Sequence, residues 1–449
     1  MNENRRDLPI VTISHRGADR LRAGHVWVYR SEVIGSDPLP PGTLVTVREH
    51  ISPKSSSDRN VRATRTLGTA FYSSSSEIAL RIISPKLVSD LYELLRGRIR
   101  DAIAYRERFV QNTNAYRVIF SEGDFLPGLM VDRYNDILSI QVLTQAMDSE
   151  QIRELVVSEL AAALNPAAII ERVDARVRRL EQLPEKESGI VYRRDDISAA
   201  HVGTGALTRP AAQSAAIGEH GSPGRTRASG PTREQENASA TEFQMNGLRF
   251  IYEALGTQKT GAFLDQRENY ATAAQYARGE ALDVFCYQGG FALHLARVSE
   301  KVTGVDSSRP ALEIADKNAA LNGKEIEWIE ANAFDLLRDY SDAGRQYDCV
   351  VLDPPAFAKS KRDLPTALRG YKELNLRALK MLRPAGILVT CSCSYHVSAS
   401  DLLQTLQSAA QDSHRIVRIL ENRGAAKDHP SVLGIPETAY LKCLIVLVS

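Results

Sequence analysis

The sequence predicts an α/β protein with a doubly wound parallel sheet in its C-terminal half, preceded by a small β-barrel and an α+β unit. The main observation is alternation of apolar strands and helical patterns: strands near residues 282, 302, 326, 349 and 387 are each followed by a helix. Further strands are expected at 416–420 and 441–448, the last of them antiparallel. The second observation is a glycine turn at residues 288–290, which joins the first strand to its helix.

Changes in pattern along the chain predict four segments. Residues 1–85 show short strands (10–14, 25–29, 43–48, 68–71 and 80–83) with Pro and Gly between them, as in a small barrel. Residues 86–192 begin with an amphipathic helix over 87–110 and continue with strands and a helix over 149–164, which we interpret as a separate α+β domain. Residues 193–241 are rich in Ala, Ser, Gly, Thr and Arg and are expected to be a flexible insertion. Residues 242–449 form the doubly wound domain.

Composition excludes some classes of protein. The chain has 449 residues, 43% of them apolar and 25% charged, and a net charge of +1, all ordinary for a globular protein. No apolar run of about 18 residues is present, and residues 1–9 are too polar for a signal peptide, so we expect a cytoplasmic protein without a membrane span. The five cysteines fit core thiols, and the spacing of Cys391 and Cys393 does not match a zinc site.

The N-terminal segment carries a cluster of arginines among aromatic residues. Arg20 and Arg22 lie close in sequence to His25, Trp27 and Tyr29, a mixture suited to phosphates and stacked bases. The alternative, a solvated basic face over a buried tryptophan, is equally compatible with the composition. We therefore carry RNA binding by Arg20 and Arg22 forward as a hypothesis.

The glycine turn indicates a nucleotide-type pocket. Gly289 and Gly290 let a backbone approach a ligand, and Asp306 ends the next strand, where a carboxylate can accept bonds from both ribose hydroxyls. The turn departs from the Gly-x-Gly-x-x-Gly pattern, since Gln288 and Leu293 occupy two of its glycine positions. S-adenosylmethionine, which has a ribose but no pyrophosphate, fits better than NAD. The alternative is a structural turn followed by an incidental Asp.

Two further motifs end strands of the predicted sheet. Asp353-Pro354-Pro355-Ala356-Phe357 is a rigid turn whose carboxylate and carbonyls can accept from a substrate amine while the phenyl ring stacks on a base. The alternative is a tight structural turn. The run 388–395 places Cys391 and Cys393 on the same side of a strand, with Cys393 nearer its open end. A thiol there is either a small buried hydrophobic group or a nucleophile.

Taken together, the motifs resemble a known family. Asp283-x-Phe-Cys-Tyr-Gln-Gly-Gly-Phe, Val-Asp306, Asp353-Pro-Pro-x-Phe, Ser-Cys393-Ser, Lys259-Thr-Gly and Leu-Asp265-Gln-Arg resemble the bacterial 23S ribosomal RNA cytosine-C5 methyltransferase I family over nearly the whole chain. The resemblance implies an N-terminal PUA domain, a middle α+β domain and a Rossmann-like class I methyltransferase domain. It also implies 23S RNA, free or in an assembly particle, as partner; a homodimer is a possible assembly.

The resemblance implies roles for individual residues. Cys393 becomes the nucleophile and Asp353 the residue that holds the cytosine edge, while Pro354, Pro355 and Phe357 join Arg20 and Arg22 as expected substrate contacts. The residues expected to bind S-adenosylmethionine are Lys259, Thr260, Gly261, Asp265, Gln266, Arg267, Asp283, Phe285, Tyr287, Gly289, Gly290, Asp306, Ser307, Asn332, Ala333 and Asp353. No metal is implied.

The sequence departs from the family pattern at two positions. Cys391 replaces an expected apolar or aromatic residue and so adds a second candidate thiol, and Asn332 replaces an expected Asp beside the adenine, where its amide oxygen can still accept from the N6 amine. Two other functions stay open. The Asp353 motif also suits methylation of an exocyclic amine of adenine or guanine, which needs no thiol, and the chain could be a non-catalytic RNA-binding assembly factor.

Overall fold

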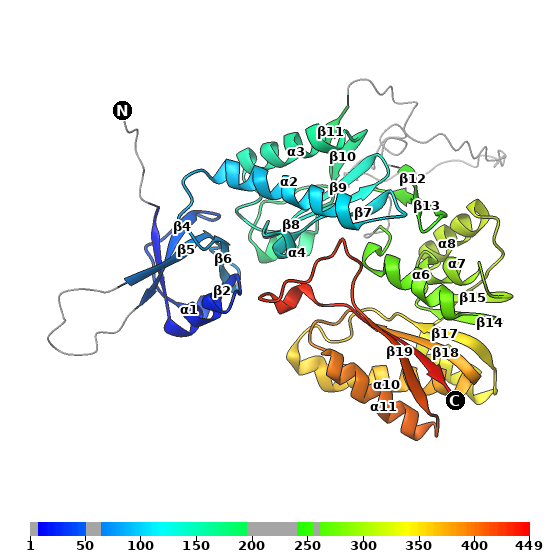
Figure 1. The fold of residues 1–449 in the computed structure, drawn as a ribbon. Helices are drawn as coiled ribbons and strands as arrows, with labels where there is room; N and C mark the ends of the chain where they lie inside the picture. The colour runs from blue at the N-terminus through cyan, green and yellow to red at the C-terminus, as the bar shows by residue number, and fades with distance from the viewer. Residues whose placement is uncertain (1–7, 51–63, 195–239, 256–260) are drawn as a thin grey trace, which may run out of the picture.

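The computed structural model describes residues 8–50, 64–194, 240–255 and 261–449. Most of the predicted insertion, and the predicted cofactor residues Lys259 and Thr260, lie outside the described residues. The described chain forms three successive units (Figure 1), each built on its own sheet, and a β-hairpin between the second and third.

In the part of the chain that the structure describes, the N-terminal unit is a six-stranded sheet with the strand order β2-β6-β5-β4-β1-β3. It wraps around a small core that includes Val11, Val28, Val45 and Leu80. Sequence reasoning missed its helix α1, which starts after Ser14, whose hydroxyl accepts a bond from the N–H of Gly17 at 3.2 Å. Its elements are β1 (Ile10–Ile13), α1 (His15–Arg22), β2 (Trp27–Tyr29), β3 (Val33–Gly35), β4 (Leu44–His50), β5 (Thr64–Tyr72) and β6 (Ile78–Ser84).

The middle unit is a mixed sheet in the order β11-β10-β9-β8-β7, in which only the β9–β10 pair is parallel among the described strands. Leu95 and Ile99 of α2 and Ile152 and Leu160 of α3 pack on one face of this sheet. Its elements are α2 (Leu91–Phe109), β7 (Ala115–Phe120), β8 (Leu129–Tyr134), β9 (Ile137–Val142), α3 (Glu150–Leu164), β10 (Ala168–Glu171), α4 (Ala175–Leu180) and β11 (Gly189–Arg193).

The C-terminal unit confirms the predicted doubly wound sheet. Its strand order is β16-β15-β14-β17-β18-β20-β19, with β14 to β18 mutually parallel and β20 antiparallel to both neighbours. Helices α6, α7 and α8 contribute to one core and α9, α10 and α11 to the other, so both faces are covered. The elements are α6 (Arg267–Tyr276), β14 (Glu280–Val284), α7 (Gly290–Leu295), β15 (Lys301–Asp306), α8 (Arg309–Leu321), β16 (Glu327–Glu330), α9 (Ala333–Asp342), β17 (Tyr347–Leu352), α10 (Leu364–Met381), β18 (Leu382–Ser392), α11 (Ala399–Asp412), β19 (Val417–Arg423) and β20 (Lys442–Val448).

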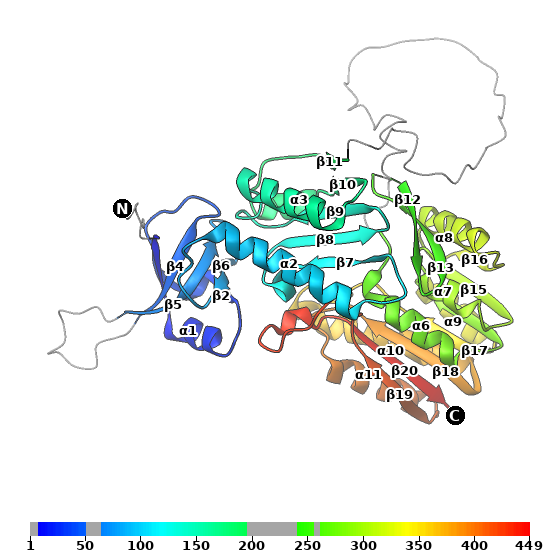
Figure 2. The same cartoon turned by 45° about the horizontal axis from the view of Figure 1, so that its top comes forward.

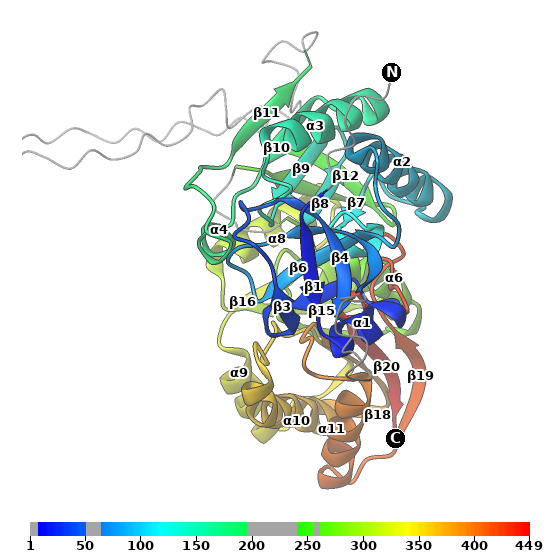
Figure 3. The ribbon, with the colours of Figure 1, turned by 90° about the vertical axis from the view of Figure 1, so that its left-hand side faces the viewer.

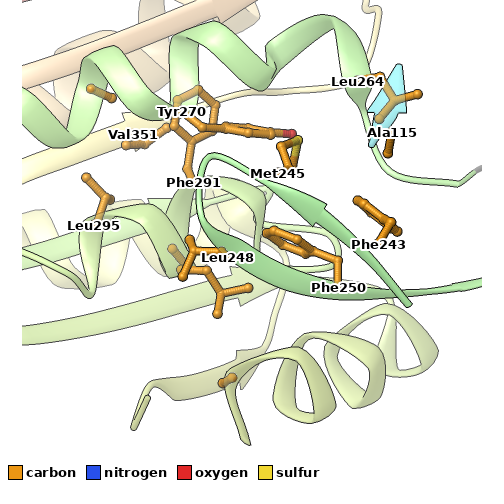
Figure 4. Close-up of a cluster of buried hydrophobic side chains, with 14 of the residues drawn as sticks. Ala115, Phe243, Met245, Leu248, Phe250, Leu264, Tyr270, Phe291, Leu295 and Val351 are labelled. Atoms are coloured by element: carbon orange, nitrogen blue, oxygen red, sulfur yellow. The ribbon is translucent and has the colours of Figure 1, made fainter. Parts of the chain in front are cut away.

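The hairpin of β12 (Ala240–Met245) and β13 (Leu248–Glu253) joins the middle and C-terminal units. Its Phe243, Met245 and Phe250 lie in one buried cluster with residues of the middle sheet and of α6 and α7 (Figure 4). Tyr134 of β8 stacks on Tyr252 with ring centroids 3.7 Å apart. One face of the middle sheet therefore packs into a core of the C-terminal unit, while its other face forms a separate core with α2 and α3.

The N-terminal unit lies beside the joined middle and C-terminal units (Figure 2). The loop before β20, drawn in red, extends toward the N-terminal unit (Figure 1). In the view from that side, the N-terminal unit lies in front of the other two units (Figure 3). His25 of the barrel bonds Glu437 of that loop, Nε2 to Oε2, at 3.1 Å. Among the described residues no helix is both long and apolar enough to cross a membrane.

Candidate active site at the carboxyl ends of the central strands

The predicted site residues gather where β14, β15, β17 and β18 end. β14 is flanked by β15 on one side and by β17 on the other, so the strand order reverses here, the position where doubly wound sheets bind ligands. The turn after β14, Asp306 at the end of β15, Asp353 after β17 and Cys393 after β18 all follow these strand ends.

The turn after β14 is held in an unusual backbone conformation. Phe285 and Tyr287 have φ of 68° and 49°, and Gly289 has φ of 83°. A left-handed backbone at two aromatic residues costs about 1–3 kcal/mol each and persists only where the surroundings hold it. Here the N–H groups of Phe285 and Cys286 both donate to the carbonyl of Val305, at 2.9 and 3.0 Å. The strain points to a functional turn rather than an incidental one.

Asp306 fixes this turn from the neighbouring strand. Its Oδ2 accepts from the N–H of Tyr287 and its Oδ1 from the N–H of Ser308, both at 2.9 Å. Each carboxylate oxygen retains a further acceptor position, and the side chain is only half-buried. Asp306 can therefore support the turn and still accept bonds from a ligand, and Ser307 beside it is exposed.

The two glycines of the turn are required for different structural reasons. A Cβ on Gly290 would lie 2.5 Å from Cζ of Tyr270, so packing against α6 requires glycine at this position. The sequence alone suggested a different reason for the same glycine, the close approach of a ligand. Gly289 needs its left-handed φ, and a Cβ there would lie 3.0 Å from the ring of Trp328. Gly261, another predicted cofactor residue, packs against Tyr134, with a Cβ position 2.2 Å from its hydroxyl.

Two predicted cofactor residues lie behind the cleft. Asp283 is 0% exposed; its Oδ2 accepts from the N–H of Ala292 at 2.8 Å, and burial raises its pKa well above the usual range. Arg267 is 1% exposed and binds Asp428 through both terminal nitrogens, at 2.9 and 3.1 Å. The structure does not bring either side chain to the cleft surface: Asp283 binds a backbone N–H of α7, and Arg267 binds the segment between β19 and β20.

Asn332 has a task that the sequence did not reveal. It caps α9: its Oδ1 accepts from the N–H of Phe334 at 2.9 Å and of Asp335 at 3.4 Å. The oxygen expected to accept from an adenine amine is thus already bonded to the helix, and its contact with the adenine stays a prediction. Ala333, the first residue of α9, is buried.

Asp353 is a half-buried carboxylate held by the segment before α6. Nε2 of Gln266 donates to its Oδ1 at 3.0 Å. Burial, and then the negative charge of Asp265, raise the pKa of Asp353 to about 7. Asp265 in turn accepts a 2.6 Å bond from the hydroxyl of Tyr440. Asp265 and Gln266 therefore position and tune Asp353.

The residues after Asp353 form a rigid turn that ends in an aromatic side chain. Pro354 is buried and Pro355 exposed. The ring of Phe357 packs 4.9 Å from that of Tyr371 and 5.9 Å from that of Phe334, centroid to centroid. Phe357 is half-buried, so one part of the ring belongs to the core and the rest is available to a substrate.

The structure distinguishes the two candidate thiols. Cys391 is 0% exposed and lies opposite Cys443 of β20. Cys393 is partly exposed, and its Sγ donates to the carbonyl of Pro354 over 3.8 Å. Burial, and then the charges of Asp353 and Asp265, raise the pKa of Cys393 to about 12. Cys393 is thus the accessible thiol, and in this state it is protonated.

Sequence reasoning missed Lys442, which lies beside this thiol. It is 8% exposed, and its Nζ donates to the carbonyls of Ser394 and Tyr440, at 2.7 and 2.8 Å. Burial lowers the pKa of Lys442 to about 8. The available signal was a single lysine in the otherwise apolar run Leu-Lys-Cys-Leu-Ile-Val-Leu-Val.

The N-terminal arginines lie away from this cleft and have carboxylate partners. Arg20 binds both oxygens of Glu32, at 2.9 and 2.7 Å, and Arg22 binds Asp19 at 2.8 Å and also Glu49. This pairing agrees with the alternative interpretation, a solvated basic face. RNA contact by Arg20 and Arg22 stays a prediction.

The side chains around the cleft beside the turn suit S-adenosylmethionine. Phe263, Phe285, Tyr287 and Asp353 line this cleft. The rings of Phe263 and Tyr287 lie 5.0 Å apart. Aromatic faces suit an adenine ring, and Asp306 and Asp353 suit ribose hydroxyls and a cationic sulfonium or amine. No group of three or more His, Cys, Asp or Glu side chains that could hold a metal occurs in the described ranges.

Comparison with known families agrees with this geometry. Residues 208–445 match a family model described as S-adenosylmethionine-dependent methyltransferase, and residues 11–51 match a PUA-like domain. The crystal structure of SMU.776, complexed with SAH, superimposes with a TM-score of 0.74 at 16% identity and covers 98% of this chain and 100% of that one. At this identity the likeness shows the fold.

Curated relatives are similar over most of both chains. Ribosomal RNA large subunit methyltransferase I of Tolumonas auensis is 34% identical, covering 85% of this chain and 87% of the relative. The proteins of the same name from Shewanella denitrificans and Shewanella amazonensis are 35% and 33% identical, covering 86% and 94% of this chain and 88% and 95% of theirs. The chain therefore belongs to the ribosomal RNA large subunit methyltransferase I family of S-adenosylmethionine-dependent methyltransferases.

Proposed function

We propose that this protein methylates C5 of a cytosine in large-subunit ribosomal RNA, with Cys393 as nucleophile. The observation that carries the proposal is a partly exposed thiol beside Asp353, at the strand ends where the cofactor cleft opens. Transfer to an exocyclic amine of adenine or guanine has no use for a thiol at this position. A binding factor without catalysis has no use for the strained turn and the fixed Asp306 beside it.

The residue types match the chemistry of C5 transfer. C5 of cytosine is a poor nucleophile until a thiolate adds to C6, which makes C5 resemble an enamine carbon. S-adenosylmethionine, when bound, supplies the electrophilic methyl group. C5 would take that methyl group, with S-adenosylhomocysteine as the leaving group. The C5 proton then leaves to water, N3 loses the proton it gained, and the Sγ–C6 bond breaks to restore the thiolate. Attack from above the ring requires the base to be unstacked, so the substrate is single-stranded or flipped out.

Asp353 is suited to act as the acid in this addition. Because its pKa is raised to about 7, its carboxyl is partly protonated near neutral pH and can donate to N3 of cytosine as the Sγ–C6 bond forms. Protonation also removes the negative charge that opposes the Cys393 thiolate. The positive charge of Lys442 also favours the thiolate. The reactive form therefore pairs a thiolate with a neutral Asp353 carboxyl.

This pairing predicts a specific pH dependence. The reactive form and the stable form, a thiol with an Asp353 carboxylate, carry the same number of protons, so their ratio is constant from about pH 7 to about pH 8, above which Lys442 loses the charge that favours the thiolate. Below pH 7 a second proton binds, and the rate of methyl transfer should fall about tenfold per pH unit. Single-turnover rates between pH 5.5 and 9 would show the break. In Asp353→Asn the break should vanish; an unchanged break near pH 7 in that variant would assign it to another group.

Asp306→Ala should weaken binding of S-adenosylmethionine by about 1.5–3 kcal/mol, the scale for hydrogen bonds to a charged group. Two causes contribute: loss of the ribose acceptors and loss of the bond that holds the N–H of Tyr287. Calorimetric titration measures the change. Asp316→Ala, which removes an exposed carboxylate on α8, is the matched control and should bind normally. Equal affinity of the two variants would place the cofactor elsewhere.

The proposed product is tested in ribosomal RNA itself. RNA from cells lacking the gene, compared by mass spectrometry with RNA from cells that carry it, should lack one 5-methylcytidine in the large-subunit RNA. Loss of an N6-methyladenosine or N2-methylguanosine instead would favour the amine-methylating alternative. An identical modification pattern in both would favour the non-catalytic assembly factor.

A further inference from the structure

A second cavity lies outside the cofactor cleft, where the three units meet. It measures about 470 Å³, within the range of roughly 300–1,000 Å³ for small-molecule sites. Trp27 and Arg81 of the N-terminal unit line it, together with Phe120 and Glu122 of the middle unit and Tyr440 of the C-terminal loop. We call it the junction pocket. Ser121, Gly123 and Gly128, in the loop between β7 and β8, also line it.

The walls of the junction pocket carry oriented aromatic rings. The indole Nε1 of Trp27 donates to Oε1 of Glu122 at 3.0 Å, which ties a barrel side chain to the middle unit. Phe120 lies 6.1 Å from the ring of Tyr440, centroid to centroid. These rings come from three separate parts of the chain, so a flat ligand between them would contact all three units.

The charged groups of the junction pocket favour a base over a phosphate. Arg117 is held by both oxygens of Asp132, at 2.8 and 2.9 Å, and Arg81 by Glu181 at 3.3 Å, so both guanidinium charges are compensated. Glu122 accepts from Trp27 and Ser121 and lies 3.8 Å from Arg81, and Glu437 accepts from His25 and Tyr395. A carboxylate has about four acceptor positions, so each of these two retains capacity for a ligand. Acceptors between aromatic faces suit a ring that carries an amino group.

The junction pocket is close to the reaction centre but separate from it. Tyr440 lines the pocket with its ring, and its hydroxyl donates to Asp265 at 2.6 Å. The charge of Asp265 acts in turn on both Asp353 and Cys393. Neither Asp353 nor Cys393 lines the pocket itself. A strand whose target base reaches Cys393 therefore has a neighbouring base within reach of the junction pocket.

We propose that the junction pocket receives an unpaired, amino-bearing nucleobase of the substrate RNA, close in sequence to the methylated base and stacked on Trp27. This inference rests on the proposed RNA methyltransferase function. It gives the N-terminal unit a role in substrate recognition that does not depend on free arginines.

Trp27 provides a direct reporter, because the sequence contains only one other tryptophan, Trp328, which packs on Gly304 by the cofactor turn. In full-length Trp328→Phe protein, a ten-nucleotide oligoriboadenylate should quench the fluorescence of Trp27 in a saturable manner. An abasic ribose-phosphate chain of the same length and charge should not. Equal quenching by both chains, or none by the oligoriboadenylate, would overturn the proposal. Binding of free AMP as tight as that of the oligomer would mark a site for a free nucleotide instead.

Variants test the same point by affinity. Trp27→Ala should weaken binding of the oligoriboadenylate by about 5- to 150-fold, the range for loss of one base–aromatic stack, and Trp27→Phe should retain most of it. Phe109→Ala, which removes an exposed ring at the end of α2, is the matched control and should bind normally. Normal calorimetric affinity for S-adenosylmethionine verifies that each variant is folded. Unchanged RNA affinity in Trp27→Ala would refute the stack.

The two proposals fail separately. If quenching depends on the base but ribosomal RNA gains no 5-methylcytidine, the C5 chemistry is wrong and the junction pocket stands. If 5-methylcytidine is made but the oligomer and the abasic chain behave alike, the junction pocket proposal alone is wrong.

Discussion

Cys393→Ser should reduce methyl transfer by at least about 10³-fold while leaving the affinity for S-adenosylmethionine unchanged. A hydroxyl has a much higher pKa than a thiol and is a far weaker nucleophile toward C6 of cytosine, so the addition step should be lost. The substitution is nearly isosteric, and Cys393 does not line the cofactor cleft, so binding should survive. Single-turnover transfer of labelled methyl groups to ribosomal RNA, together with calorimetric titration, measures both quantities.

Cys391→Ser is the matched control. Cys391 is 0% exposed, so a hydroxyl there should cost about 1–3 kcal/mol of stability through burial of a polar group, but activity should persist. Wild-type rates in Cys393→Ser, or loss of activity only in Cys391→Ser, would contradict the assignment.

Asp428→Ala should destabilise the protein by about 3–5 kcal/mol, because it removes the buried partner of Arg267 and leaves only the partly exposed Glu268, 3.6 Å away. Asp428 is 0% exposed, and besides Arg267 it accepts from the N–H of Arg117 of β7 at 2.8 Å. The carbonyl of Asp428 also accepts from Arg106 of α2 at 2.7 Å. The loss therefore affects the joint between the middle and C-terminal units, and urea unfolding followed by circular dichroism should show it.

Acid should weaken the same joint. Burial alone would raise the pKa of Asp428, but the charges of His429 and Arg267 outweigh it and hold the pKa well below the usual range. The stabilisation is therefore present above the pKa of an unfolded aspartate, about 4, and is lost as pH falls toward the folded value. Asp335→Ala, which breaks an exposed pair with Arg338, should cost less than about 1 kcal/mol. A similarly small cost for Asp428→Ala would show that the pair does not hold the joint.

The sequence predicted the parts of the site that depend on local pattern. Strands that end on Asp306 and Asp353 alternate with helices, and parallel strands bring their carboxyl ends to one edge of the sheet, so strand alternation alone predicts that these two carboxylates lie together. Strand alternation also placed Cys391 deeper than Cys393, which the structure confirms.

The features that the sequence did not predict depend on tertiary packing. Gly290 is glycine because of Tyr270, which comes from a different helix, and Arg267 binds Asp428, 161 residues away. Helix α1 was missed because its apolar face is short, and only Ser14 marks its start. The junction pocket joins Trp27 to Tyr440 across almost the whole chain, and no local pattern reports such a contact.

Covalent trapping tests the central claim, that Cys393 attacks the base. Large-subunit ribosomal RNA transcribed with 5-fluorocytidine has no C5 proton to lose at the target, so the enzyme and RNA should stay joined after methyl transfer and survive denaturing electrophoresis. Peptide mass spectrometry of the wild-type complex should find the RNA attached to Cys393, and Cys393→Ser should give no complex. Attachment to Cys391, or methylation of natural RNA by an enzyme that forms no complex with the fluorinated RNA, would contradict the account.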